Sequence, residues 1–282
     1  MTMNNNSKVV LVTGCAKGGI GYEYCKAFAE SNCRVFASDI EKMSNDHFSL
    51  DNIETLQLDV SSNNSVESAV GAIVSKHGRI DIVVNNAGIG NSGPLVELPI
   101  DMIRKAYEIN VLGHLRLIQQ VVPYMVDQRK GTIVNVGSVV GTVPTPWAGS
   151  YCATKAAIHA ISDTLRVELK PFGIDVVLVV PGAIKSNFGR NNAKMLEKYD
   201  NEWKIYEGFR NVISERANAS QGGKATDASV LARYVANKVL SPRPPKVIRF
   251  GHMTGLFSLL SWSPIWVRDL FFSTRFGLNK KI

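Results

Sequence analysis

Three side chains near the middle of the chain have the types and spacing needed to move a proton to or from an oxygen atom. Tyr151 and Lys155 are four residues apart, so on a helix they lie on one face about one turn apart. Ser138 precedes them across a segment rich in glycine and proline. The ammonium can lower the pKa of the phenol, the phenol can exchange a proton with a carbonyl or alcohol oxygen, and the serine can hold that oxygen. Such a pair is also common on ordinary helices, so its meaning depends on the rest of the chain.

The composition is that of a globular protein with a large core. With 282 residues, 45% of them hydrophobic and 20% charged, a single α/β domain is favoured over two small ones. The four cysteines show no Cys-x-x-Cys spacing, so we expect reduced packing residues, with no disulfide framework and no metal site. The opening MTMNNNSK lacks the apolar segment of a secretory signal, which predicts a cytoplasmic or cytosol-facing protein.

A glycine-rich turn lies between a predicted strand and a predicted helix near the start of the chain. Residues 8–13 form a short apolar run, GCAKGGIG follows at 14–21, and a helical segment comes next. Glycines allow the backbone to approach a pyrophosphate, and a helix N-terminus supplies N–H groups and a positive dipole end. The order strand, turn, helix therefore indicates a dinucleotide site.

The residues after the next two predicted strands bear on which dinucleotide binds. Asp39 ends the strand at 34–38, where its carboxylate can accept hydrogen bonds from both ribose hydroxyls of an adenosine and would repel a 2′-phosphate. Lys17 in the glycine turn acts in the opposite sense, because a cation there can contact a 2′-phosphate. Asp59, in a strand predicted at 55–60, is placed to reach the adenine edge. The sequence thus favours NAD(H), with NADP(H) as the alternative.

The remaining strands alternate with helices. We predict strands at 80–84, 131–136 and 174–180, and helices at 61–76 and 101–127; Asn110 lies within the second helix, where it needs a specific hydrogen-bond partner. His114, on the same helix, is read as a packing or surface residue. This alternation predicts a doubly wound parallel sheet with helices on both faces, whose ligands bind at the carboxyl ends of the strands. Every polar candidate lies at such an end or on an adjoining helix.

Several of these motifs, in this order, resemble the short-chain dehydrogenase/reductase family over residues 8–250. The resemblance implies a Rossmann-type fold, a nicotinamide cofactor and a catalytic tetrad. Tyr151 would be the general acid/base, Lys155 would bind the nicotinamide ribose and lower the pKa of the tyrosine, Ser138 would orient the substrate, and Asn110 would support a relay water. The motifs that carry it are Thr13–Gly21, Asn85–Gly88, Asn110, Ser138, Tyr151, Lys155 and Pro181–Gly182.

The same resemblance implies the residues that bind the cofactor and a homodimer formed through the helices that carry Asn110 and Tyr151. It implies no nucleic-acid partner. The cofactor-binding positions are Gly14, Lys17, Gly19, Ile20, Gly21, Asp39, Asp59, Val60, Asn86, Ala87, Gly88, Tyr151, Lys155, Pro181, Gly182, Ile184 and Ser186.

One branch of the family fits several details. The glycine turn is one residue longer than usual, and together with the segment 163–184 and an aromatic C-terminal tail it resembles the 1-acyldihydroxyacetone-phosphate reductase branch. That branch implies lipid chemistry, NADPH and membrane association. Its second strand usually ends in a basic residue near the position of Ile40, whereas this chain has Asp39 and Ile40. This departure puts NADPH, and with it the implied substrate, in doubt.

Two segments beyond these motifs are expected to control what binds. Residues 187–223 are polar and helical, and we predict a substrate lid there. Its aromatic residues Trp203, Tyr206 and Phe209 either line an apolar pocket or are packing residues. Candidates for the substrate pocket itself are Ser138, Val143, Trp147, Tyr151 and Phe188.

The second segment is an amphipathic tail at 251–282. From residue 241 onward seven basic residues and one acid give a net charge of +6, most of the +8 of the whole chain. Pro264 and charged residues interrupt the tail, so it is unsuited to span a bilayer. It either associates with an anionic lipid surface, such as the endoplasmic reticulum or a lipid droplet, closes over the substrate, or joins two subunits.

Three hypotheses about function follow. The first is an oxidoreductase that transfers a hydride between NAD(H) and a secondary alcohol or ketone on an apolar, lipid-, terpenoid- or alkaloid-like substrate. The second is an NADPH-dependent 1-acyldihydroxyacetone-phosphate reductase at a membrane surface. The third, from a different class, is a cofactor-binding scaffold without turnover. All four tetrad positions are filled, which favours an enzyme.

Overall fold

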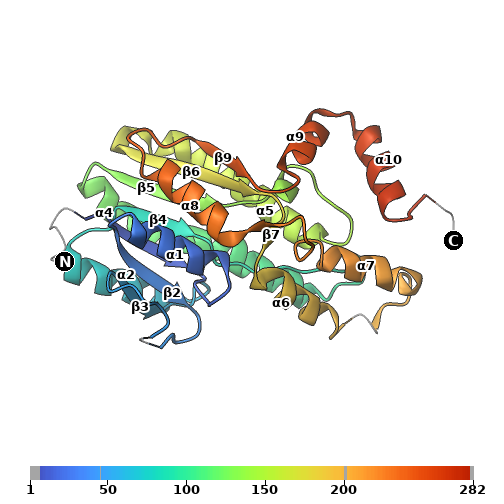
Figure 1. Ribbon diagram of the computed structural model, residues 1–282, viewed down its shortest axis with the longest axis horizontal. Coiled ribbons are helices and arrows are strands. Elements are labelled where there is room, and N and C mark those ends of the chain that lie inside the picture. Colours follow the sequence, from blue (N-terminus) through green and yellow to red (C-terminus); the bar gives the residue numbers. More distant parts are fainter. Residues whose placement is uncertain (1–6, 45, 200–201, 280–282) are drawn as a thin grey trace.

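The computed structural model describes residues 7–44, 46–199 and 202–279, and its centre is a seven-stranded parallel sheet (Figure 1). The strand order is β3-β2-β1-β4-β5-β6-β9, and every pairing is parallel. The predicted doubly wound α/β sheet is therefore confirmed. The strands are β1 (Val9–Thr13), β2 (Arg34–Asp39), β3 (Ile53–Gln57), β4 (Ile82–Asn85), β5 (Gly131–Val136), β6 (Ile174–Pro181) and β9 (Val247–Phe250).

Helices cover both faces of the sheet, so the central strands are apolar along their whole length. One core joins β1, β4, β5 and β6 to α1 (Ile20–Glu30) and α8 (Ala228–Val239). A second core, on the opposite face, joins the sheet to α2 (Asn63–His77) and α4 (Gly113–Asp127). Chain order reverses between β1 and β4, and this switch point opens a crevice at the carboxyl ends of the strands.

Two expected elements differ from the structure. β3 lies at Ile53–Gln57, earlier than the predicted 55–60, because Asp59 turns the chain: its carboxylate accepts hydrogen bonds from the N–H and hydroxyl of Ser61. The helix predicted at 101–127 is not a continuous α-helix. It consists of α3 (Ile100–Tyr107), a π-helical turn (Glu108–Leu112) and α4.

The cysteines behave as expected. All four are free and buried, and Cys15 Sγ lies 3.4 Å from Cys25 Sγ in the core beneath the glycine turn. Within the described residues no cluster of three or more histidine, cysteine or acidic side chains is suited to a metal ion.

The predicted lid contains α6 (Asn187–Leu196) and α7 (Arg210–Ala217), which lie together beyond the sheet (Figure 1). A short parallel pair, β7 (Ile184–Lys185) with β8 (Thr226–Asp227), closes the base of this excursion. Residues 200 and 201 of the predicted lid lie outside the described residues.

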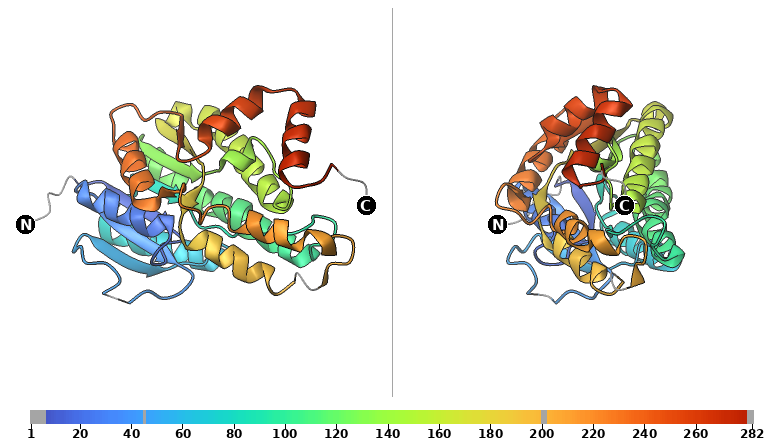
Figure 2. Two further views of the ribbon diagram at one scale, coloured as in Figure 1. Left: turned by 45° about the vertical axis from the view of Figure 1, so that its right-hand side comes forward. Right: turned by 90° about the vertical axis from the view of Figure 1, so that its right-hand side faces the viewer.

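The tail forms two helices, α9 (Thr254–Trp262) and α10 (Ile265–Arg275), with a sharp turn at Pro264 (Figure 2). Arg268 fixes this turn by donating hydrogen bonds to the carbonyl oxygens of Ser261 and Ser263. Phe257, Leu260 and Phe272 on its inner side are buried in a third core, together with the segment after β5. In the described part of the chain no helix is long and apolar enough to cross a membrane.

Candidate active site

The end of β5 and the start of α5 (Gly149–Glu168) bring Ser138, Tyr151 and Lys155 to one place. Ser138 follows β5 and caps a 3₁₀ turn, where its hydroxyl accepts a long hydrogen bond from the N–H of Val140 (3.4 Å). Lys155 is 4% exposed, and its Nζ donates to the carbonyl oxygen of Val136 at 2.8 Å. That bond ties helix to strand and leaves Nζ 5.6 Å from the centroid of the Tyr151 ring.

The surroundings of Tyr151 keep its phenol protonated at neutral pH. Burial raises the pKa of Tyr151 above its ordinary value and Cys152 acts in the same direction, whereas Arg216 and the Ser138 hydroxyl lower the pKa. Burial also lowers the pKa of Lys155 to about 8. A protonated phenol beside an ammonium of reduced pKa suits a general acid that must later accept its proton back.

Asn110 lies in the π-helical turn between α3 and α4, and its side chain is completely buried. Its amide oxygen accepts from the N–H of Ile89, and its amide nitrogen donates to the Ile89 carbonyl and to Thr154 Oγ1. Thr154 immediately precedes Lys155 on α5. Asn110 therefore joins the loop after β4 to the helix that carries Tyr151 and Lys155. Ile89 and Thr154 are the specific hydrogen-bond partners that Asn110 was predicted to need.

The glycine turn forms a cradle that side chains would fill. Gly14 has φ +72°, and a Cβ on Gly21 would lie 2.2 Å from the Gly14 carbonyl oxygen. Gly19 is the N-cap of α1, and Ile20 is its first residue, so the positive end of this helix faces the turn. The close approach of backbone to backbone fits a bound pyrophosphate. These residues would hold the phosphates of a nicotinamide dinucleotide.

Asp39 and Lys17 share a pocket of about 360 Å³ beside the glycine turn. The Asp39 carboxylate accepts a hydrogen bond from the N–H of Ala16 (2.8 Å), which fixes it at the end of β2. Lys17 is exposed. Asp59 and Val60 lie after β3, in the turn that leads to α2. The Asp59 carboxylate already accepts a hydrogen bond from the Ser61 hydroxyl.

Thr13 supports the segment Asn86–Gly88 and was missed as a site residue. Its Oγ1 accepts hydrogen bonds from the N–H groups of Asn86 (3.1 Å) and Ala87 (3.0 Å). The Asn86 side chain in turn donates to the carbonyl oxygens of Thr13 and Gly14. The loop after β4 is thus fixed to the glycine turn. The sequence feature that could have identified Thr13 is its place as a polar residue at the end of an apolar strand.

His114 fixes the same loop from the other side, as a buried packing residue. Its Nε2 lies 2.9 Å from the Ala87 carbonyl oxygen, which can only accept, so Nε2 carries the proton. Burial and the charge of Lys155 lower the pKa of His114 to about 3, despite the bond to Ala87. The ring is therefore neutral at neutral pH.

This burial predicts a loss of stability in acid. Because the pKa of His114 is lower in the folded chain than in the unfolded one, the unfolded state binds more protons below about pH 6.5, and the free energy of unfolding falls until about pH 3. Between pH 7 and pH 5 the contribution of His114 is about 2 kcal/mol. We expect His114→Gln, which keeps a donor to Ala87 without titrating, to reduce the slope of the pH dependence measured by urea unfolding. The pKa of His159, which burial lowers to about 4, accounts for a further part of that slope.

The control for this experiment is His252→Gln, since His252 is exposed. It should keep the parental slope. An His114→Gln variant whose stability falls with pH as steeply as the parent would contradict the assignment.

The segment after β6 closes the other side of the crevice. Gly182 passes so near the backbone at residue 252 that a Cβ would lie 1.9 Å from the His252 carbonyl oxygen. Pro181 ends β6, Ile184 is in β7, and Ser186 is the N-cap of α6. Asn187, a second missed residue, reaches the glycine turn: its N–H donates to the Gly18 carbonyl and its amide to that of Lys17. The predicted lid thus begins in contact with the glycine turn.

The residues predicted to form the substrate pocket pack in or against the same core as Tyr151. The Tyr151 and Phe188 rings are 5.3 Å apart, and Val143 and Trp147 are buried. The Trp147 ring contacts those of two lid residues, Tyr206 and Phe209. Trp203 is buried as a packing residue in the third core. Phe188 therefore contacts the Tyr151 ring, and Val143 and Trp147 belong to the buried core against which Tyr151 packs. These three residues form the predicted apolar wall of the substrate site.

Glu97 anchors the lid and was also missed. Its carboxylate accepts hydrogen bonds from the N–H groups of Lys204 (2.8 Å), Ile205 (3.1 Å) and Tyr206 (3.2 Å). Desolvation alone would raise the pKa of Glu97, but these three bonds outweigh it and lower the pKa. Glu97 lies more than 100 residues before these partners in the sequence, so the sequence alone did not predict the contact.

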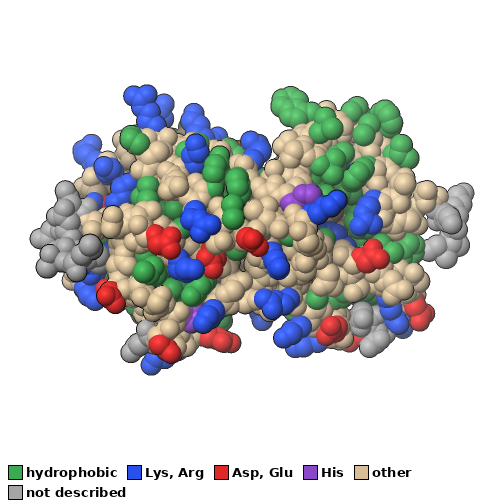
Figure 3. Space-filling view, in the orientation of Figure 1, with side chains coloured by type: hydrophobic (Ala, Val, Ile, Leu, Met, Phe, Trp, Pro, Cys, Tyr) green, Lys and Arg blue, Asp and Glu red, His purple; other side chains and the backbone are tan. Residues whose placement is uncertain are grey.

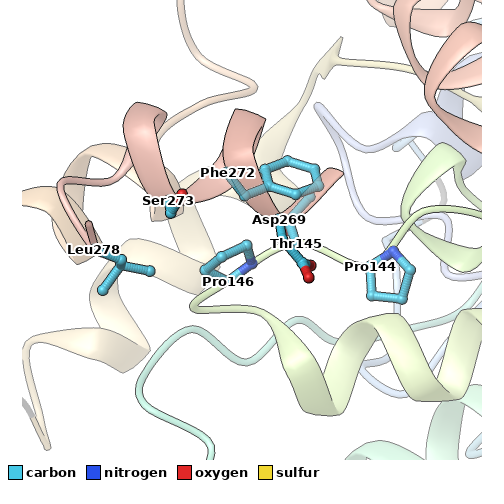
Figure 4. A pocket seen from close by; sticks show the side chains of 7 residues that line it. All are labelled: Pro144, Thr145, Pro146, Asp269, Phe272, Ser273 and Leu278. Carbon is cyan, nitrogen blue, oxygen red and sulfur yellow. The ribbon is translucent and has the colours of Figure 1, made fainter. Parts of the chain in front are cut away.

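A further pocket, of about 400 Å³, lies between the tail and the loop before Trp147 (Figure 4). Pro144, Thr145 and Pro146 form one side, and Asp269, Phe272, Ser273 and Leu278 form the other. None of the tetrad residues lines it. The tail therefore covers a pocket of mixed polarity beside the segment that leads to Trp147.

Comparison with known proteins identifies the family of the chain. The short chain dehydrogenase family model matches residues 8–197. The short-chain dehydrogenase ptmH of Penicillium ochrochloron is 33% identical, with 93% of this chain and 96% of the relative covered. The NADPH-dependent 1-acyldihydroxyacetone phosphate reductase of Schizosaccharomyces pombe is 34% identical, with 75% of this chain and 72% of the relative covered.

Solved structures share the fold. A short-chain dehydrogenase from Streptomyces avermitilis superposes with a TM-score of 0.79 at 24% identity, covering 99% of this chain and all of the other. A short-chain dehydrogenase/reductase from Burkholderia phymatum in complex with NAD has a TM-score of 0.76 at 21% identity, covering 92% and 94%. The closed form of serine dehydrogenase with NADP+ has a TM-score of 0.73 at 23% identity, covering 87% and 95%. This chain belongs to the short-chain dehydrogenase/reductase family of NAD(P)-dependent oxidoreductases.

Proposed function

We propose that the protein transfers a hydride between NAD(H) and a secondary alcohol or ketone on an apolar substrate. The observation that carries the cofactor choice is Asp39, held at the end of β2 by the Ala16 N–H. The apolar wall of Val143, Trp147 and Phe188 beside Tyr151 supports the substrate class. The non-catalytic scaffold gains no support, since all four tetrad positions are filled.

Each tetrad residue has its own role in the proton transfer. A bound NAD(H) would supply the hydride chemistry at the substrate carbon. In the reducing direction Tyr151 gives its phenolic proton to the carbonyl oxygen, and in the oxidising direction it takes the proton back. Ser138 holds that oxygen. Lys155 binds the nicotinamide ribose and stabilises the tyrosinate by its charge, while Asn110 supports the water that restores the proton.

The cofactor preference is a direct test. The Asp39 carboxylate would repel a 2′-phosphate in a poorly screened crevice, so we expect NAD(H) to be preferred over NADP(H) in kcat/KM. Asp39→Ser should lower that preference at least about tenfold, which corresponds to about 1.4 kcal/mol. Parallel measurements of kcat/KM with both cofactors check this.

Glu41→Gln is the matched control, because Glu41 lines the same pocket and also carries one negative charge. It should leave the preference within about threefold of the parent. A parent enzyme that uses NADP(H) as well as or better than NAD(H) would contradict the proposed role of Asp39.

That contrary result would favour the second candidate, an NADPH-dependent 1-acyldihydroxyacetone-phosphate reductase. Exposed Lys17, in the same pocket as Asp39, can contact a 2′-phosphate. The relative from Schizosaccharomyces pombe bears that activity in its name. Turnover of a 1-acyldihydroxyacetone phosphate with NADPH at a kcat/KM above that of every neutral ketone would establish it.

We also propose that the tail binds an anionic lipid surface facing the cytosol, such as the endoplasmic reticulum or a lipid droplet. Its outer side carries Leu259, Trp262 (91% exposed), Ile265, Trp266 (67% exposed) and Leu270. Figure 3 shows hydrophobic side chains gathered over this end of the molecule, with Lys and Arg side chains farther along the same edge. Exposed tryptophans and nearby cations suit a bilayer interface. Lys280 and Lys281, which contribute to the net charge of +6 counted from residue 241 onward, lie outside the described residues.

Replacing both tryptophans tests this role. We expect Trp262→Glu/Trp266→Glu to lower binding to vesicles of phosphatidylcholine and phosphatidylserine at least about tenfold, because apolar burial is lost and repulsion is added. The value of kcat/KM for a short, water-soluble ketone should be unchanged. Val230→Glu, on the exposed side of α8, is the control. Undiminished vesicle binding by the double variant would contradict the proposal.

A homodimer through α4 and α5 is proposed for the same chain. Tyr107, Leu112, Val167 and Phe172, on or next to these helices, are exposed, which supports an apolar contact there. Light scattering after gel filtration should give twice the monomer mass of 30.9 kDa. The Val167→Glu variant should give the monomer, and an unchanged dimer would exclude this surface.

A further inference from the structure

Arg216, at the end of lid helix α7, carries a positive charge without a carboxylate partner in the described part of the chain. Its Nε and Nη2 both donate to the hydroxyl oxygen of Thr145, at 3.1 and 2.9 Å. A neutral hydroxyl leaves the charge uncompensated and most of the five guanidinium donors available. Arg210, on the same helix, differs because it pairs with Glu207.

The surroundings of Arg216 belong to the substrate side of the protein. Thr145, 6% exposed, precedes the wall residue Trp147 by two positions. Cys152 points its Sγ at the Thr145 carbonyl oxygen (4.0 Å) and follows Tyr151 in the chain. Ile213 and Ala217, neighbours of Arg216 on α7, are buried in the core against which Tyr151 packs.

The Arg216 charge also affects the pKa of the Tyr151 phenol. Burial lowers the pKa of Arg216, whereas Cys152 and Tyr151 raise it, and Arg216 in turn lowers the pKa of Tyr151. Arg216 is half-buried, so its guanidinium is partly shielded from water. Such shielding without a counter-charge is unfavourable, and an anion that enters the site reduces that penalty. Guanidinium binds carboxylate and phosphate oxygens in pairs, which a ligand can exploit through the remaining donors.

We propose that Arg216 binds an anionic group of the substrate, a carboxylate or a phosphate, beside the carbonyl or alcohol that Tyr151 serves. The inference deepens the proposed function and rests on it: the substrate is then an anionic amphiphile whose apolar part lies along Val143, Trp147 and Phe188. The Thr145 hydroxyl orients the guanidinium by accepting two of its hydrogen bonds, and Arg216 itself lies on lid helix α7. Arg216 is thus a specificity residue of the lid.

Binding of unreactive probes tests this without turnover. Octanoate, octyl phosphate and octanol share one chain and differ in the head group. With the NADH-bound protein, calorimetry should show at least one of the two anions binding about tenfold or more tighter than octanol. The two anions separate a carboxylate site from a phosphate site. Arg216→Gln should remove the preference and leave octanol binding unchanged, and Arg216→Lys should retain part of it.

Arg210→Gln is the matched control, because it removes a positive charge from the same helix at a paired position. It should keep the parental preference for the anion. Urea unfolding of each variant verifies that the lid variants remain folded. Octanol binding as tightly as both anions in the parent, or a preference unchanged in Arg216→Gln, overturns the proposal.

A kinetic arm distinguishes this inference from the proposed function. If ketones turn over, 3-oxodecanoate should exceed its methyl ester in kcat/KM, and Arg216→Gln should abolish that ratio by lowering kcat/KM for the acid far more than for the ester. An equal loss for acid and ester with a shifted pH profile would mean that Arg216 acts only on Tyr151, which contradicts the inference. If no carbonyl compound turns over, the proposed function fails, and the calorimetry still decides whether an anion binds.

Discussion

Tyr151→Phe should lower kcat by about 10²–10⁴-fold while the Kd for NADH stays close to that of the parent. The phenol oxygen is the group that passes the proton, and phenylalanine keeps the ring against Phe188 and the contact with Lys155. Loss of one hydroxyl therefore removes the acid/base step without disturbing the cradle for the cofactor. Steady-state kinetics and a fluorescence titration with NADH measure the two quantities.

Tyr24→Phe is the matched control. Tyr24 is fully buried in α1, and its hydroxyl has no hydrogen-bond partner among the described residues. Removing an unsatisfied buried hydroxyl should leave kcat unchanged and raise the free energy of unfolding by about 1 kcal/mol. A Tyr151→Phe variant with more than half the parental kcat would refute the role assigned to Tyr151.

Gly21→Ala should weaken NADH binding by about a hundredfold or more, or about 2.7 kcal/mol. The added Cβ would stand 2.2 Å from the Gly14 carbonyl oxygen and 2.6 Å from the Asn86 side-chain nitrogen. Both atoms belong to the cradle, so the glycine turn must shift away from the loop after β4. Calorimetric titration with NADH measures the loss.

Gly71→Ala controls for the substitution itself. Gly71 lies within α2, and a Cβ there would meet nothing within 4 Å. This variant should bind NADH normally. Because alanine is favoured over glycine in a helix interior, its free energy of unfolding should rise by about 0.5–1 kcal/mol. NADH affinity in Gly21→Ala within about threefold of the parent would contradict the cradle.

The parts of the fold that are local in sequence were predictable. Apolar runs ending at glycine or at a polar residue marked β1, β2, β4, β5 and β6 within about two residues, and their alternation with helices required a parallel sheet. β9 was not recognised as a strand, because its four residues follow a proline-rich segment and acquire a strand pattern only against β6. The break at Pro264 was predictable from proline alone.

The site divides in the same way. Spacing predicted that Tyr151 and Lys155 share a helix face, and the glycine pattern predicted the cradle. Contacts between distant segments were not predictable: the bond from Lys155 to Val136, the Glu97 carboxylate under the lid and the Arg216–Thr145 pair each depend on how loops meet in space. The π-helical turn at Asn110 likewise reflects its three tertiary hydrogen bonds, because the local sequence alone fits an α-helix.

The most direct test of the central claim follows the absorbance of NADH while the purified protein meets a panel of apolar ketones and secondary alcohols. The proposed function predicts oxidation of NADH that depends on a ketone, reversal with the matching alcohol and NAD+, and loss of both in Tyr151→Phe. It also predicts a lower kcat/KM when NADPH replaces NADH. An absorbance change that is absent with every compound, or that Tyr151→Phe retains in full, would contradict it.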